Sequence, residues 1–171
     1  MNCRSVIASL LCAGLLVTME VTAATAPIKL AVFDFELEDF SAGASSTDAP
    51  DAAHLSNVTA MVRQLFAQSE RYKLIDVESV EAPAVRAHTL RDCNGCDADI
   101  ALKLGAEQSL VGVVSRISRT EYVVKFQVRD TRTGTVVVAA DSGLRMGADY
   151  SWSRGATRLI KEKLLETRSE P

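Results

Sequence analysis

The stretch Ile28-Lys29-Leu30-Ala31-Val32-Phe33-Asp34-Phe35 decides the fold of this 171-residue chain. Its side chains alternate between apolar and polar at first and become continuously apolar at the centre, which is typical of a strand buried on both faces. The stretch leads into a segment rich in Ser, Ala, Gly, Asp and Pro that ends at Pro50. This composition predicts a loop after the first strand.

A helix and a second strand follow that loop. Apolar side chains recur at three- and four-residue steps from about Asp51 to Ser69, which predicts a helix with one buried stripe. Residues 72–77 predict a short buried strand, so the natural arrangement is a right-handed parallel crossover. The next segment, Val80–Thr89, contains Pro83, and we expect a short, broken helix there.

The second half of the chain predicts further strands and a closing helix. Residues 110–117 and 122–128 alternate between apolar and polar side chains, which predicts two strands. The short turn at residues 130–134 leads into a further strand at residues 135–140, which favours an antiparallel meander. Helical spacing predicts helices at Cys96–Leu104 and from Trp152 onward. We therefore predict an α/β (α+β) fold in a single domain. It has a mixed sheet of about five strands with helices packed on it, and its C-terminal antiparallel meander is followed by a helix.

The first residues have the three-part layout of a secretory signal peptide. Arg4 precedes an apolar run from Val6 to Val17, and Val21-Thr22-Ala23 offers a small-residue cleavage site. We expect residues 1–23 to be a signal peptide and residues 24–171 to form a single secreted domain in the periplasm. The run is shorter than the ~20 apolar residues that span a bilayer, so we expect no integral membrane segment after processing.

Charge and aromatic content argue against nucleic-acid binding. The chain has 19 basic and 22 acidic residues, a net charge of −3, and Trp152 is its only tryptophan. Nucleic-acid binding usually requires a basic face that displaces counterions, and single-strand binding requires stacking aromatics. We expect no nucleic-acid partner, no metal and no cofactor.

Two cysteines, Cys93 and Cys96, remain once the leader is removed, and they form a CxxC motif in an oxidising compartment. Asp97 stands where haem attachment requires a histidine. The pair is either a structural disulfide that pins a loop or an exchange-active pair at the start of a helix. Neighbouring carboxylates would raise the pKa of a thiol there, which favours the structural disulfide. We take Asn94 and Gly95, between the cysteines, as candidate partner contacts.

Two other places are candidates for binding. Asp34, Glu36, Glu38 and Asp39 form an acidic cluster where the first strand ends, at the edge where α/β domains often hold ligands. Asp34 and Glu36 are the candidate ligand rim, for calcium or another small ligand. The alternative is a solvated acidic surface. Trp152 and Arg154 form a candidate partner anchor if Trp152 is exposed. If Asp149 or Ser151 caps the last helix instead, Trp152 is buried behind the cap.

Several segments together resemble a known family. They are residues 31–37, 69–72, 93–96, 104–106, 130–134 and 149–155. They look like a family of uncharacterised secreted bacterial proteins, a domain of unknown function associated with gene neighbourhoods of quinoprotein alcohol dehydrogenases. The order of elements is also similar, more loosely, to the amino-terminal domain of TolB and to the curli secretion lipoprotein domain. The resemblance implies a periplasmic accessory protein with an envelope partner, for example a quinoprotein (PQQ) dehydrogenase or its cytochrome.

The residues themselves name no reaction. We expect a non-enzymatic periplasmic accessory or binding module that uses the CxxC loop and the Trp152 region, in the setting of a quinoprotein alcohol oxidation system. The alternative is a thiol-disulfide exchange or electron-transfer helper that uses Cys93 and Cys96. A third class is binding of a small ligand near Asp34 and Glu36.

Overall fold

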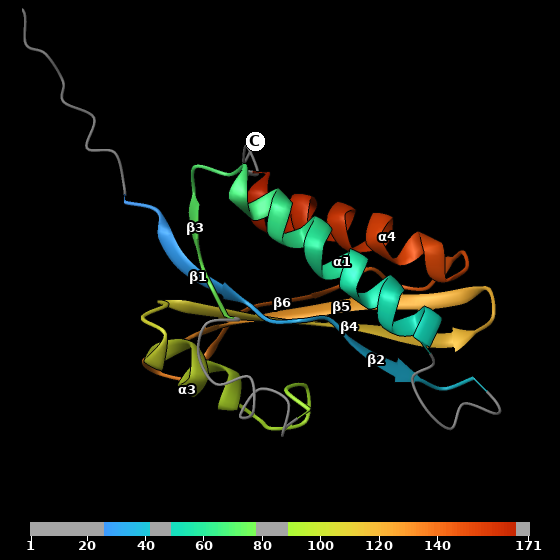
Figure 1. Cartoon of the computed structure of the whole chain (residues 1–171), viewed down its shortest axis with the longest axis horizontal. Coiled ribbons are helices and arrows are strands. Elements are labelled where there is room, and N and C mark those ends of the chain that lie inside the picture. The colour runs from blue at the N-terminus through green and yellow to red at the C-terminus, as the bar shows by residue number, and fades with distance from the viewer. Residues whose placement is uncertain (1–25, 42–48, 78–88, 167–171) are drawn as a thin grey trace, which may run out of the picture.

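A computed structural model describes residues 26–41, 49–77 and 89–166. One mixed sheet forms its centre, with the strand order β3-β1-β4-β5-β6, while β2 pairs with β4 and β7 with β5 (Figure 1). The strands are β1 (Ile28–Val32), β2 (Glu36–Asp39), β3 (Tyr72–Ile75), β4 (Gln108–Ser118), β5 (Glu121–Asp130), β6 (Val136–Asp141) and β7 (Arg145–Met146). The helices are α1 (Ala49–Ala67), α3 (Cys96–Lys103), α4 (Trp152–Ile160), and the short η1 (Asp149–Ser151) and η2 (Lys161–Leu165). The mixed α/β fold is therefore as predicted.

The helices cover the two faces of the sheet unequally. Of the described helices, Figure 1 shows α1 and α4 together on one face and α3 on the other, at one end. The larger apolar core lies under α1 and α4, and a smaller core that includes Ala31, Phe33 and Val111 lies under α3. β1 pairs parallel with both β3 and β4. The predicted meander is present, because β5 pairs antiparallel with β4 on one side and with β6 on the other.

β1 and β2 lie one after the other along the same edge of β4. Val32 is level with Leu110 and Glu36 with Val113, so β1 and β2 advance four residues while β4 advances three. The extra residue acts as a β-bulge, which reverses the direction of the side chains that follow. Before it, Val32 faces α1 and α4. After it, Leu37 faces those helices instead, and the glutamates of β2 turn to the other face.

Gly112 makes room for this break in the strand. The ring of Phe35 lies over Gly112, and a Cβ atom at that position would overlap the ring. Phe35 is buried in the core, and its amide donates to the buried hydroxyl of Thr59 on α1 at 2.9 Å. The absence of a side chain on β4 at this point is therefore what allows β2 to continue along it.

Arg116, near the end of β4, links four elements. Its guanidinium donates to Asp39 of β2 at 2.7 Å, to Asp51 of α1, and to Asp149 of η1 at 3.4 Å, and it lies over the Trp152 ring at 5.2 Å. Burial alone would lower the pKa of Arg116, but the hydrogen bond to Asp51 and the charges of Asp149 and Asp39 outweigh it and raise the pKa. The charged guanidinium therefore holds the starts of both helices against the sheet.

The structure corrects the assignment of Trp152 as a candidate partner anchor. Its side chain is only 1% exposed, so it is not a surface anchor for a partner, and the alternative of a buried Trp152 holds. The predicted cap does not form, because neither the start of α4 at Ser151 nor the start of η1 has a side-chain capping bond. Asp149 accepts a bond from Arg116 instead.

Most predicted elements are present, with shifted ends. The helix expected from Asp51 to Ser69 is α1, and the one expected at Cys96–Leu104 is α3. The short strands β2 and β7 were missed. The predicted signal peptide, residues 1–23, and most of the broken helix expected at Val80–Thr89 lie outside the described residues.

Gly112→Ala should test the close approach of Phe35. We expect the free energy of unfolding to fall by ~1–3 kcal/mol, because the added methyl group overpacks the site. In urea titrations, Phe35→Leu should relieve this loss, so the double variant should be more stable than the two single losses predict. Strict additivity of the two effects would contradict the account.

Candidate functional site

A hollow lies on the part of the sheet that no described helix covers. It has a volume of about 420 Å³ and lies next to the loop that enters α3. We call it the sheet-face hollow; it is lined by Glu38, Arg91, Asp92, Val111, Val113, Lys125, Phe126, Gln127, Ala139, Ala140 and Asp141. It therefore combines strands β2, β4, β5 and β6 with one loop.

The loop of residues 90–96, the clamped loop, is held by the CxxC pair. Cys93 and Cys96 form a disulfide with their Cα atoms 5.6 Å apart. Asn94 and Gly95 between them adopt left-handed conformations, with φ 48° and φ 118°, and Gly95 precedes the first residue of α3. Both sulfurs are half-buried and pack against the core under α3. The disulfide thus fixes the tight turn that starts this helix.

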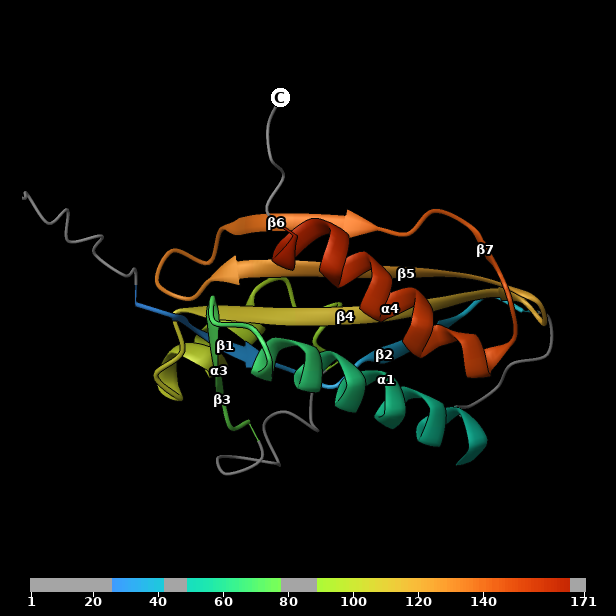
Figure 2. The same cartoon turned by 90° about the horizontal axis from the view of Figure 1, so that it is seen from above.

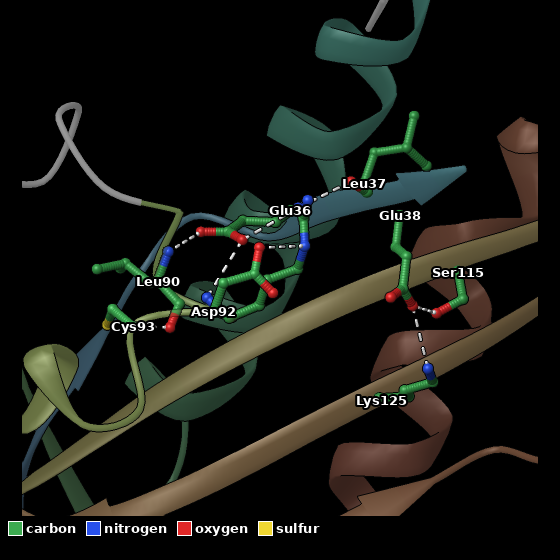
Figure 3. Close-up of polar contacts among 9 residues, drawn as sticks. Glu36, Leu37, Glu38, Leu90, Asp92, Cys93, Ser115 and Lys125 are labelled. Atoms are coloured by element: carbon green, nitrogen blue, oxygen red, sulfur yellow. Dashed lines mark hydrogen bonds and ion pairs between the residues drawn. The ribbon is translucent and has the colours of Figure 1, made fainter. Parts of the chain in front are cut away.

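Glu36 ties the clamped loop to β2. Its carboxylate accepts hydrogen bonds from the backbone amide of Leu90 at 2.6 Å and from the backbone amide and guanidinium of Arg91 at 3.3 Å (Figure 3). The Arg91 guanidinium also donates to the carbonyl oxygen of Leu37 at 3.0 Å and pairs with Asp92 at 3.4 Å. These bonds hold the loop at the rim of the sheet-face hollow.

Glu38, two residues further along β2, lies at the hollow itself. Its carboxylate accepts a hydrogen bond from Ser115 at 2.6 Å and one from Lys125 at 3.1 Å, as Figure 3 shows. The Ser115 hydroxyl and the Lys125 ammonium outweigh the effect of burial and lower the pKa of Glu38 below its usual value near 4.5. Glu38 therefore stays ionised and paired at neutral pH.

Asp97, which the sequence places beside the disulfide, points toward the sheet. It is fully buried, accepts a hydrogen bond from Ser109 at 2.6 Å, and lies 3.5 Å from the Arg129 guanidinium. A buried polar group is costly unless it has partners of this kind. The contacts of Asp97 therefore join α3 to β4 and β5.

The predicted rim residues do not come together. Asp34 is 78% exposed and pairs with Arg63 of α1 at 3.0 Å, at a second hollow between α1 and the break after β1. Glu36 faces the clamped loop on the side of α3. The two carboxylates therefore belong to different surfaces.

The predicted partner residues are also divided between two faces. Asn94 is exposed on the clamped loop and Gly95 is half-buried there. Arg154 is exposed on α4, which packs on the opposite face of the sheet, as Figure 2 also shows. The structure therefore does not bring the CxxC loop and the Trp152 region into one surface.

Sequence reasoning placed Glu38 in the acidic cluster after the first strand but missed Ser115 and Lys125, its partners in the site. Glu36-Leu37-Glu38 alternates polar and apolar side chains, which is a signal for a strand with one polar face. Ser115 and Lys125 come from β4 and β5, and only the strand register brings them next to Glu38.

Comparisons with known proteins give a family and a fold. A family described as "Protein of unknown function (DUF2380)" matches residues 28–164. The C-terminal domain of LpoB from Salmonella enterica is 19% identical, with a TM-score of 0.50, over 73% of this chain and 87% of that one. No curated protein matches the chain.

Two further solved structures are similar. The hypothetical protein CT253 from Chlamydia trachomatis is 12% identical, with a TM-score of 0.51, over 80% of this chain and 93% of that one. The lipoprotein GNA1162 from Neisseria meningitidis is 14% identical, with a TM-score of 0.50, over 71% of this chain and 82% of that one. At such identities the likeness shows a shared fold.

Within the described residues, no helix has the length and apolar character needed to cross a membrane.

Glu36→Ala should loosen the clamped loop. The Leu90 and Arg91 amides would lose their acceptor, so we expect a loss of ~1–3 kcal/mol in the free energy of unfolding and faster hydrogen exchange at both amides. Asp34→Ala is the matched control, because it removes only an exposed ion pair and should cost about 1 kcal/mol or less. Equal exchange rates at the Leu90 and Arg91 amides in the two variants would contradict the role of Glu36.

Proposed function

Because the chain belongs to the family described as "Protein of unknown function (DUF2380)", which names no activity, we propose its function from the site itself. The protein is a non-enzymatic accessory module of the periplasm that binds another envelope protein. Its binding surface is the sheet-face hollow together with the clamped loop. The prediction of a family of unknown function agrees with the match; the partner and the location are parts of the proposal.

One observation carries this proposal: among the described residues, helical cover on the second face of the sheet is found at one end only. α3 packs against β1 and β4 at one end of the sheet. Beyond α3, the strands β4, β5 and β6 carry a mixture of apolar and charged side chains around a hollow of about 420 Å³. A concave surface with an apolar floor and a few charged groups is typical of a binding site.

The chemistry of the lining favours binding over catalysis. Glu38 is paired with Lys125, and Arg91 is paired with Glu36 and Asp92. These groups therefore hold each other in place, as the polar residues of a pre-formed recognition surface do. A disulfide and a buried ion pair fix the adjacent loop and helix, which reduces the entropy that binding would cost.

Sequence and fold support the envelope as the location. Residues 1–23 have the layout of a signal peptide. One protein of similar fold, GNA1162 from Neisseria meningitidis, is a lipoprotein. The family resemblance gives the finer proposal that the partner is a quinoprotein alcohol dehydrogenase or its cytochrome.

A photo-crosslinking amino acid in place of Gln127 should test the surface in living cells. Gln127 lines the hollow, and we expect one discrete adduct with an envelope protein, identified by mass spectrometry. The same amino acid in place of Arg158, exposed on α4 on the opposite face, is the matched control and should give no such adduct. A quinoprotein dehydrogenase or its cytochrome in the adduct would support the finer proposal, and a different envelope protein would overturn it while supporting the general one. No adduct, or the same adduct from both positions, would overturn the binding surface.

The alternative function is thiol-disulfide exchange or electron transfer by Cys93 and Cys96. The observation that favours it is that Cys96 is the first residue of α3, where the helix dipole stabilises a thiolate. Against it, both sulfurs are half-buried in an apolar cluster, which limits attack by another thiol.

The reduction potential of the pair separates the two functions. We expect the disulfide to stay oxidised throughout glutathione redox buffers, with a potential below about −300 mV, as in structural disulfides. The measurement is thiol trapping after equilibration at a series of glutathione ratios. A potential between roughly −120 and −230 mV, the range of exchange catalysts, would favour the alternative.

A further inference from the structure

β6 forms one edge of the sheet. Within the described residues it pairs with β5 alone, and Figure 2 shows it at the margin of the sheet. Its sequence is Val-Val-Val-Ala-Ala-Asp, and Val136 and Val137 are 43% and 48% exposed. The outer edge of β6 therefore offers backbone donors and acceptors next to exposed apolar side chains.

Free edges of this kind are usually protected. Short length, lysine, proline or a β-bulge keeps an edge strand from pairing with other chains. β3, at the opposite edge, has only four residues and contains Lys73. β6 has six residues and contains no lysine, arginine or proline, and its only charged residue is Asp141 at its end.

A β-bulge protects only the beginning of β6. Val138 is level with Val128, and Val136 is level with Arg129, so Val137 is an extra residue against β5. The part from Val138 to Asp141 pairs regularly with β5. This part remains suited to accept another strand.

We propose that β6 pairs antiparallel with β6 of a second copy of this chain, so that two sheets join into one. This inference concerns the outer backbone edge of β6 and stands without the proposed function, although Ala139, Ala140 and Asp141 of the same strand also line the sheet-face hollow. The contact is isologous, because each copy contributes the same strand to a two-fold axis. Since that axis is perpendicular to the joined sheet, the sheet-face hollows of both copies lie on the same side.

The distribution of charge favours a second copy as the partner. Antiparallel pairing brings the Asp141 end of one strand toward the Val136 end of the other. The exposed Arg132 lies just before that end, in the turn between β5 and β6. The pairing therefore places opposite charges near each other twice, whereas parallel pairing would place one Asp141 beside the other.

The interface is small, so the association should be reversible. A pair of six-residue strands buries less than the roughly 1,200 Å² of a typical stable interface. We expect a monomer-dimer equilibrium that is visible as a rise of the average mass with concentration in sedimentation equilibrium. The protein should be purified after expression with its own leader, at micromolar to millimolar concentrations.

Two sets of variants test the contact. Ala139→Lys places a charge near the middle of β6, where the two strands meet, and should weaken dimerisation about ten-fold or more. Ala60→Lys, on the exposed side of α1, is the control with the same added charge and should dimerise normally. An unchanged urea midpoint for both variants would show that folding is unaffected.

Exchanging the charges tests the antiparallel arrangement itself. Asp141→Arg and Arg132→Asp should each weaken the dimer by about two- to five-fold, as expected for exposed charge pairs. The double variant should regain the original association, because the pair is restored with reversed signs. A monomer at every concentration, a dimer that Ala139→Lys leaves intact, or a double variant without recovery would overturn the proposal.

Discussion

The extra residue between β1 and β2 is the constraint on which the rest of the structure depends. Without it, the alternation of β1 would continue, and Glu36 and Glu38 would point into the core under α1 and α4. The bulge instead directs Leu37 into that core and both glutamates to the opposite face. One residue of offset thus supplies the carboxylate that holds the clamped loop and a carboxylate that lines the sheet-face hollow.

Arg116 fixes the packing on the face of the sheet that α1 and α4 cover. Two of its bonds are made to Asp51 at the start of α1 and Asp149 at the start of η1, and the dipole of α1 also favours negative charge at Asp51. The same guanidinium lies over Trp152, which is the largest fully buried side chain. Polar and apolar contacts of one residue therefore fix how both helices pack, and the opposite face is left to α3 and the hollow.

The sequence predicted the parts of this fold that depend on local periodicity. The spacing of apolar residues indicates the buried strand at Ile28, the helix near Leu55 and the meander. β2 has four half-exposed residues and three of them are acidic, so its composition resembles a loop. The reversal of side chains after Val32 depends on how many residues β4 uses over the same distance, and no local pattern contains that information. The site was therefore predicted only in part. The CxxC motif identifies Cys93, and the end of the first strand identifies Glu36, but Lys125 is brought to the site by strand register.

The position of β4 in the chain has a consequence for the order of assembly. Lys29 and Glu107 bond to each other across β1 and β4 although 78 residues separate them. β4, β5 and β6 are joined by short turns, so their contacts close small loops, whereas β1 must close a very large one. β1 can pair with β3 once residues 72–75 are synthesised, but any nascent chain that ends before Gln108 lacks β4, the strand on which both halves of the sheet are built.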